Sequence, residues 1–163
     1  GCVIHLGFCA SLIQLRSNTK FQSTFLEIES GKFLIFYIVL IAILMDSIAF
    51  FAGKSFGKRP FITNVSPNKT LEGFMAAIIA TPLLLSTISF NIFNLPFFLV
   101  LCILVVVSLY SVLGDAFASM MKRTVAVKDY SNLIPGHGGL FDRLDSHIAA
   151  FPCFVFLLNI VSK

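Results

Sequence analysis

The stretch "FLIFYIVLIAILMDSIAFFAG", residues 33–53, decides the fold class of this chain. It contains a single charged side chain, Asp46, in an otherwise apolar run. A bilayer core about 30 Å thick is crossed by roughly 17–25 apolar residues in a helix, because lipid offers no partner to a free backbone polar group. The stretch therefore predicts a transmembrane helix.

Two more apolar stretches are long enough to cross a membrane, at 74–90 and 95–118, and two weaker ones lie at 1–15 and 148–161. Prolines within such segments can kink a span without ending it. We predict an all-α polytopic membrane protein with about five transmembrane helices, one or two of them incomplete, in a single domain over residues 1–163. Because the chain does not begin with Met, we expect further helices before it.

Composition supports an integral membrane protein and excludes a nucleic-acid-binding one. The chain is 57% hydrophobic and only 12% charged, about half the charge of a typical soluble domain. The formal net charge of +4 is divided among several loops. Since no basic arm is present, we expect no nucleic-acid partner.

Two polar loops, 54–73 and 119–147, carry an excess of Lys and Arg. Two predicted spans separate them, so both loops face the same side of the membrane. Basic loops are retained on the cytoplasmic side. We therefore predict that these two loops form a cytoplasmic active site, and that the uncharged connector 91–94 faces outward.

The end of the 95–118 span carries a polar face. On a helix, Asp115, Ser119 and Lys122 lie at i, i+4 and i+7, which is one side. A carboxylate at the edge of the hydrocarbon is costly unless it has a partner, so it indicates a functional site. The alternative is that these side chains simply reach out to the membrane surface. By the same reasoning, Asp46 should face a polar cavity or a cation.

The stretch "IPGHGGLFDRLDS", residues 134–146, combines a glycine-rich turn with the start of a helix. Pro135 fixes φ, and the glycines let backbone N–H groups face an anion. Asp142 and Asp145, at i and i+3, share a helical face. Carboxylates beside bound phosphates are typical ligands of Mg²⁺. His137 is either a general base or a turn residue. The alternative for the whole loop is a solvent-exposed connector without a catalytic role.

The other loop contains "NVSPNKTLEGF", residues 64–74. Ser66 followed by Pro67 is a typical N-cap and first position of a helix, and we predict that this helix leads into the next span. Capping alone would explain Ser66, but the positive end of the helix would also attract a phosphate or a carboxylate, with Lys69 and Thr70 nearby.

The stretch "SMMKRTVAVKDYSNLIPGHGGLFDRLD", residues 119–145, resembles the signature of the phosphatidate cytidylyltransferase (CDP-diacylglycerol synthase) family. The matching positions are Ser119, Lys122, Arg123, Lys128, Asp129, Ser131, Pro135, His137, Gly138, Gly139, Asp142, Arg143 and Asp145. Residues 45–74 resemble a second block of the family. Departures from the family pattern there are Phe50, Asn68, Leu71 and the pair Ala76 and Ala77.

The resemblance implies an enzyme that transfers CMP from CTP to phosphatidic acid, giving CDP-diacylglycerol and pyrophosphate for phospholipid biosynthesis. It implies Mg²⁺, with a second cation left open, and a location in a bacterial inner membrane or an organellar membrane. Because members of the family tend to be dimers, it also implies a homodimer among membrane lipids.

Roles for individual residues follow from the same resemblance. The implied metal ligands are Asp115, Asp142 and Asp145. The implied phosphate ligands are Lys122, Arg123, Lys128 and Arg143. The part of the site that binds the nucleotide or the lipid phosphate would be shaped by Ser66, Lys69, Thr70 and Glu72. Asp46 would lie in the polar cavity. The substrate would also be contacted by Ser119, Gly138 and Gly139. Asp129 either binds metal or pairs with Lys128. His137 is still either a general base or a turn residue.

Two rival functions remain open from the sequence. A CTP-dependent polyprenol or lipid-alcohol kinase has a similar need for nucleotide, metal and membrane, but it would release CDP. An ion transporter could use Asp46 and Asp115 as an ion path. That rival predicts acidic residues at several depths, whereas the charge here gathers in two loops.

Overall fold

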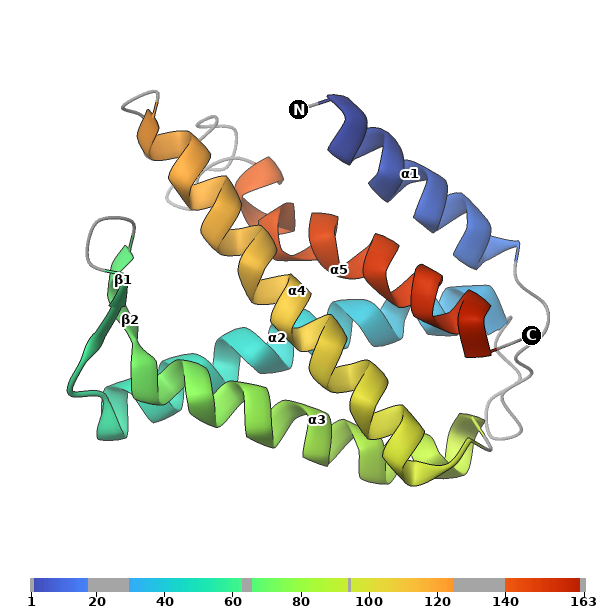
Figure 1. The fold of residues 1–163 in the computed structure, drawn as a ribbon, viewed down its shortest axis with the longest axis horizontal. Helices are drawn as coiled ribbons and strands as arrows, with labels where there is room; N and C mark the ends of the chain where they lie inside the picture. The colour runs from blue at the N-terminus through green and yellow to red at the C-terminus, as the bar shows by residue number, and fades with distance from the viewer. Residues whose placement is uncertain (1, 18–29, 63–65, 94, 125–139, 162–163) are drawn as a thin grey trace.

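The computed structural model describes residues 2–17, 30–62, 66–93, 95–124 and 140–161. Within these ranges, five helices form an elongated bundle with a two-stranded hairpin at one end (Figure 1). The elements are α1 (Cys2–Arg16), α2 (Ser30–Phe56), β1 (Pro60–Ile62), β2 (Ser66–Thr70), α3 (Leu71–Phe93), α4 (Phe97–Thr124) and α5 (Leu140–Val161).

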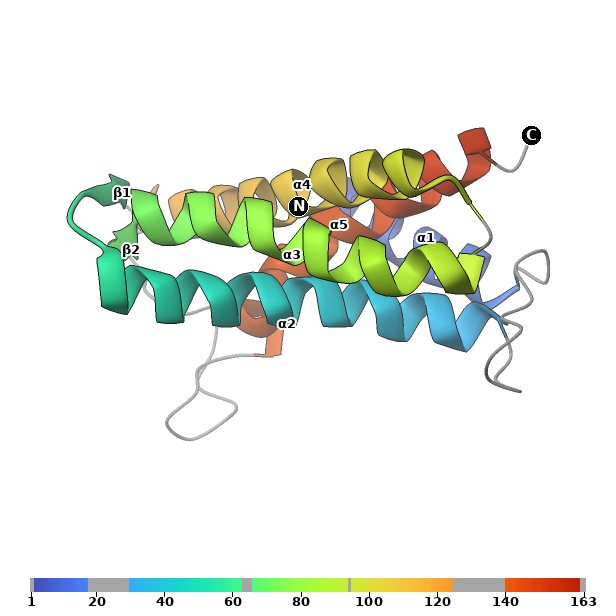
Figure 2. The same cartoon turned by 90° about the horizontal axis from the view of Figure 1, so that it is seen from below.

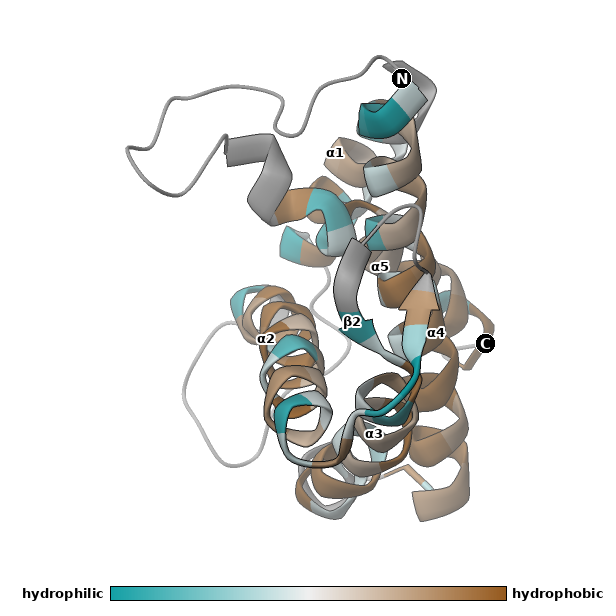
Figure 3. Ribbon diagram, turned by 90° about the vertical axis from the view of Figure 1, so that its left-hand side faces the viewer, coloured by the Kyte–Doolittle hydropathy of each residue, from teal (hydrophilic) through white to brown (hydrophobic). Residues whose placement is uncertain are grey.

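Four of the described helices are long and apolar enough to cross a membrane. The candidate spans are Lys32–Phe56, Leu71–Ser89, Phe97–Thr124 and Leu144–Val161, whereas α1 has only 15 residues. Pro82 and Pro152 lie inside α3 and α5 without ending them. Figure 3 shows hydrophobic residues along the helices and hydrophilic ones near the hairpin and the helix ends. The predicted all-α polytopic membrane fold is confirmed.

The helices pack as neighbouring pairs (Figures 1 and 2). The most extensive contacts join α2 to α3 and α4 to α5, while α1 packs on α5. Leu34, Ile38 and Ile41 repeat at helical spacing and bury one face of α2. They share a core cluster with Phe151 of α5, whose ring meets that of Phe8 of α1 edge-on at 5.2 Å. This core holds the middle of the bundle together.

Small residues let two helix pairs approach closely near the hairpin end. A Cβ added to Gly73 of α3 would lie 2.5 Å from the carbonyl oxygen of Ala49 in α2. A Cβ added to Gly114 of α4 would lie 2.7 Å from the Cβ of Ala149 in α5. Close backbone approach through small residues is a common way to join helices in lipid. These close approaches fix the relative positions of α2 and α3, and of α4 and α5, near the hairpin.

The prediction that Ser66 and Pro67 begin a helix is wrong. Both lie in β2, which pairs antiparallel with β1, and α3 begins at Leu71. The extended backbone that a residue before proline favours suits an N-cap as well as a strand, so the pairing of β2 with β1 decides between them. Thr70 caps the helix instead, because its hydroxyl accepts the N–H of Gly73 at 3.3 Å.

Candidate functional site

A cavity of about 560 Å³ lies between α2, α3 and α4 at the hairpin end of the bundle. Part of its wall is apolar, with contributions from Met45, Phe61, Phe74 and Val112. Its polar lining consists of Asp46, Lys54, Lys69, Thr70, Ser111, Asp115 and Ser146. An apolar cavity with a few convergent polar groups is typical of a small-molecule site.

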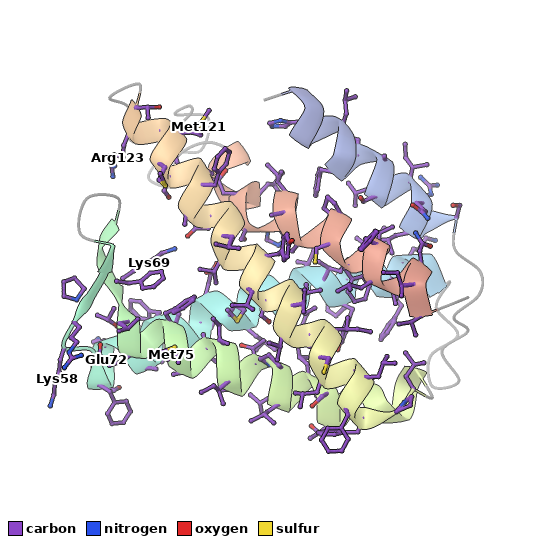
Figure 4. All side chains as sticks on the ribbon, viewed as in Figure 1. Lys58, Lys69, Glu72, Met75, Met121 and Arg123 are labelled. Carbon is purple, nitrogen blue, oxygen red and sulfur yellow. The ribbon has the colours of Figure 1, made fainter. Side chains whose placement is uncertain are left out.

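An ion pair between Lys69 and Asp115 crosses this cavity. The Lys69 ammonium group donates a hydrogen bond to the Asp115 carboxylate, and Figure 4 shows Lys69 reaching from the hairpin toward α4. The side chains are 49% and 26% exposed. An ion pair this exposed contributes at most about 1 kcal/mol. A bound phosphate or cation could therefore replace either partner at little cost.

Two charged residues of α2 line the same cavity. Asp46 and Lys54 are separated by eight residues, or about two helical turns, and so lie along one face of the helix. Phe50, between them, lines the cavity as well. The structure thus places Asp46, the acidic residue within the apolar stretch of α2, in the lining of a cavity that also contains two lysines.

Glu72 and Thr70 hold the hairpin in place. The Glu72 carboxylate accepts the backbone N–H groups of Lys58 and Arg59, each at 3.1 Å. It ties the segment after α2 to the first turn of α3, while Thr70 caps that turn. Through these contacts, Glu72 and Thr70 fix the position of the hairpin that carries Lys69.

A second ion pair lies apart from the cavity lining. The Lys122 ammonium group donates to the Asp145 carboxylate at 2.8 Å, and the side chains are only 11% and 4% exposed. The pair joins the last turns of α4 to the first turns of α5. Ser119 is half-buried and Arg123 is exposed near that end of α4, and neither lines the cavity. Figure 4 shows Arg123 at the end of α4. Roles for these four in metal or phosphate binding stay predictions.

The remaining predicted site residues fall wholly or partly outside the described residues. The segment 125–139, before α5, lies outside the described residues and contains Lys128, Asp129, His137, Gly138 and Gly139. Ser66 lies in β2, and Asp142 and Arg143 lie in the first turn of α5, with only their backbone placed. Asp142 occupies the position one helical turn before Ser146, which lines the cavity.

Comparison with known proteins assigns the chain to a family. The family model described as "Cytidylyltransferase family" matches residues 2–161. This chain belongs to the cytidylyltransferase family.

Several curated relatives of this cytidylyltransferase-family chain carry the same name. The phosphatidate cytidylyltransferase of Bacillus subtilis (strain 168) is 38% identical over 162 residues, covering 98% of this chain and 56% of the relative. That of Haemophilus influenzae is 42% identical over 157 residues, covering 91% of this chain and 52% of the relative. The chain therefore spans about half the length of these curated relatives.

A solved structure titled "Structural insight into an intramembrane enzyme for archaeal membrane lipids biosynthesis" is a more distant match. It is 20% identical, with a TM-score of 0.47, covering 76% of this chain and 91% of that chain. This likeness is too distant to bear on the function of the family member described here.

Sequence reasoning missed three polar residues of the cavity of this cytidylyltransferase-family chain. Ser111 lies four residues before Asp115 on α4, and Lys54 lies eight residues after Asp46 on α2. Helical spacing could have revealed both, because each shares a face with a predicted site residue. Ser146 follows Asp142 by four residues, so the same rule would have indicated it.

The donor atoms of the cavity fit the type of Mg²⁺ site that the family resemblance implies. Mg²⁺ commonly binds one or two carboxylates and completes its shell with water and substrate phosphates. Asp46 and Asp115 supply two carboxylates to one cavity. Among the described side chains there is no cluster of three or more His, Cys, Asp or Glu residues able to hold a metal alone. The arrangement suits a cation that arrives with a phosphate ligand.

Proposed function

We propose that this chain is the catalytic portion of a phosphatidate cytidylyltransferase. Such an enzyme transfers CMP from CTP to phosphatidic acid and produces CDP-diacylglycerol and pyrophosphate. The observation that carries the proposal is a cavity in a membrane bundle that combines Lys54, Lys69, Asp46 and Asp115 with apolar walls. The names of the curated relatives support the same substrates.

The chemistry requires charge neutralisation more than proton transfer. A phosphate oxygen of phosphatidic acid attacks the α-phosphorus of CTP. The bond from that phosphorus to the oxygen bridging to the β-phosphorus breaks, and pyrophosphate leaves with the electron pair. Because a phosphate monoester is already anionic, the chain need not supply a strong base.

The cavity residues have separate roles in this proposal. The ammonium groups of Lys54 and Lys69 neutralise substrate phosphates and the developing charge on pyrophosphate. The carboxylates of Asp115 and Asp46, with Asp142 of the first turn of α5, would hold Mg²⁺. When bound, Mg²⁺ would supply positive charge that offsets the charge of the substrate phosphates. Before substrate binds, the Lys69–Asp115 pair keeps both groups in the cavity.

The orientation of the site belongs to the same proposal. The hairpin end of the bundle carries the basic residues Lys54, Lys58, Arg59 and Lys69, and basic loops face the cytoplasm, where CTP is available. We therefore assign the cavity to the cytoplasmic side. The homodimer and a second cation stay predictions.

The direct test measures conversion of radiolabelled CTP and phosphatidic acid in detergent micelles, with and without Mg²⁺. The intact chain is compared with Asp115→Asn and Asp142→Asn, and with Thr87→Ala as a control substitution at an exposed position on α3. We expect a Mg²⁺-dependent CDP-lipid that both aspartate variants lose and the control retains. Full activity in both aspartate variants would refute the site assignment. Release of CDP with a phosphorylated lipid alcohol would favour the kinase rival.

A further inference from the structure

An apolar groove lies directly beside the charged cavity. Its volume is about 260 Å³, and the described residues that line it are all uncharged. Phe61 of β1 and Phe74 of α3 form one side of the groove. From α4, Val106, Leu109, Tyr110 and Leu113 form the other.

The two hollows share a wall. Phe61, Phe74 and Val112 line both the charged cavity and the apolar groove. The rings of Phe61 and Phe74 stack with centroids 4.3 Å apart and an interplanar angle of 22°. A ligand with a charged head and an apolar tail could therefore place the head on one side of this stack and the tail on the other.

The groove runs along α4 into the membrane-spanning part of the helix. Its lining residues on α4 extend from Ala116 back to Val106, a distance of about 15 Å at 1.5 Å per residue. Leu109, Tyr110 and Leu113 are 39%, 49% and 61% exposed on this surface. The charged end of the cavity lies toward the hairpin, so the direction from cavity to groove is from polar end to bilayer interior.

We propose that this groove binds one acyl chain of the phosphorylated lipid whose phosphate occupies the charged cavity, an assignment that rests on the proposed function. The choice of a phosphorylated lipid follows from charge complementarity. Lys54 and Lys69 line the cavity beside the carboxylates of Asp46 and Asp115. The two ammonium groups would pair with the phosphate charge of an anionic head group, whereas a zwitterionic head group already carries a cation of its own. The groove would then contribute to substrate affinity through burial of the acyl chain.

The first test uses a spectroscopic reporter that does not depend on catalysis. The chain contains no Trp, so Tyr110→Trp introduces a single fluorophore into the groove. Ile79→Trp is the matched control, because Ile79 is 55% exposed on α3 and lines neither hollow. Each variant is titrated in nanodiscs with phosphatidic acid or phosphatidylcholine brominated on the acyl chain.

We expect saturable quenching in Tyr110→Trp, with half-maximal quenching at a mole fraction of phosphatidic acid at least tenfold lower than that of phosphatidylcholine. The Ile79→Trp control should respond equally to both lipids. Adding Lys69→Met to the reporter should remove the preference, because the cavity loses a phosphate ligand. Equal titration curves for the two lipids in Tyr110→Trp would overturn the proposal.

A second test measures catalysis with lipids of different chain length. Leu113→Trp fills part of the groove, and Leu83→Trp is the control at an exposed position on α3. We expect Leu113→Trp to raise the KM for dioleoyl phosphatidic acid about tenfold, while the KM values for dihexanoyl phosphatidic acid and CTP change less than twofold. An equal effect on all three substrates would overturn the groove assignment.

The two tests separate failure of the groove from failure of the proposed function. Selective quenching by phosphatidic acid without any CDP-lipid product would support the groove and refute the cytidylyltransferase reaction. Product formation with no lipid selectivity at the reporter would support the reaction and overturn the groove.

Discussion

At the scale of single residues, the burial of an ion pair decides whether its members can also bind a ligand. The Lys69–Asp115 pair is partly exposed in a cavity, so its members remain available to a ligand. The Lys122–Asp145 pair is almost completely buried, so its members are held by each other and by their surroundings. Burial therefore distinguishes the residues that can exchange partners from those that join two helices.

We predict that Lys69→Met lowers kcat/KM for CDP-lipid formation by about 10–100-fold. A hydrogen bond to a charged group is worth about 1.5–3 kcal/mol, and each 1.4 kcal/mol corresponds to about tenfold in rate. Lys58→Met is the matched control, since Figure 4 shows Lys58 directed away from the bundle and it does not line the cavity. The steady-state assay with CTP and phosphatidic acid measures both. Similar losses in the two variants would show that Lys69 has no special role.

We predict that Asp145→Asn lowers the free energy of unfolding in detergent by about 3–5 kcal/mol, because it removes the carboxylate charge that the buried Lys122 ammonium group meets at 2.8 Å. The double variant Lys122→Met with Asp145→Leu should regain most of that loss. Unfolding of the purified chain by a denaturing detergent measures this double-mutant cycle. Additive losses in the double variant would contradict a direct coupling between the two side chains.

At the scale of elements, the site depends on how closely α2 and α3 approach and on how the hairpin is fixed. Gly73 lies against the backbone of α2, and Glu72, the preceding residue, binds the backbone that follows α2. The first turn of α3 thus sets both the spacing of the helix pair and the position of the hairpin. Lys69 is carried on that hairpin, two residues before α3 begins.

Gly73→Ala should lower the free energy of unfolding by about 1–3 kcal/mol, because overpacking forces the backbone to move. The added Cβ would lie 2.9 Å from the Cα of Gly53 and 2.5 Å from the carbonyl oxygen of Ala49. Gly7→Ala is the control, since a Cβ there meets nothing within 4 Å. Thermal unfolding in detergent provides the measurement. A Gly73→Ala chain as stable as Gly7→Ala would show that the helices can separate freely.

Glu72→Ala should increase hydrogen–deuterium exchange at the amides of Lys58 and Arg59, which lose their carboxylate acceptor. Glu72→Gln keeps one acceptor oxygen without the charge, so we expect it to show a smaller increase. Exchange followed by mass spectrometry on peptides covering 57–62 measures both variants. Unchanged exchange in Glu72→Ala would mean that other contacts hold this segment.

At the scale of the whole molecule, the bundle gathers its charged cavity at one end and leaves apolar helix surface along its length. Phe98 and Phe156, for example, are 78% and 65% exposed, which suits side chains facing lipid. The charged cavity and the apolar groove share the same end of the bundle. A nucleotide could then approach from water while a lipid remains in the membrane.

We predict opposite accessibility for the two ends of α3. In a variant with its cysteines replaced by serine, Lys58→Cys should react with a membrane-impermeant maleimide added from the cytoplasmic side. Leu95→Cys should react only with reagent added from the other side. Inverted and right-side-out vesicles provide the two conditions. Labelling of both positions from one side would contradict a spanning α3, and the reverse pattern would contradict the proposed cytoplasmic location of the cavity.

Much of the fold could be predicted from sequence because lipid imposes a local rule. A long apolar stretch must be helical in a membrane, so residues 33–53 predicted α2 without knowledge of any contact. The N-terminal end of α3 was harder. Ser66 and Pro67 suit either a helix start or an extended strand, and only pairing with β1 selected the strand.

The candidate site was predictable as a set of residue types but not as an arrangement. The sequence by itself determined a membrane bundle with charged loops, because apolar length and charge are properties of local segments. It also indicated Lys69, Asp115 and Asp46 as candidate site residues. Only the tertiary structure joined Lys69 to Asp115 and buried Asp145 against Lys122. Both pairings join residues from different elements, and contacts between segments distant in sequence leave no periodic signal in either segment.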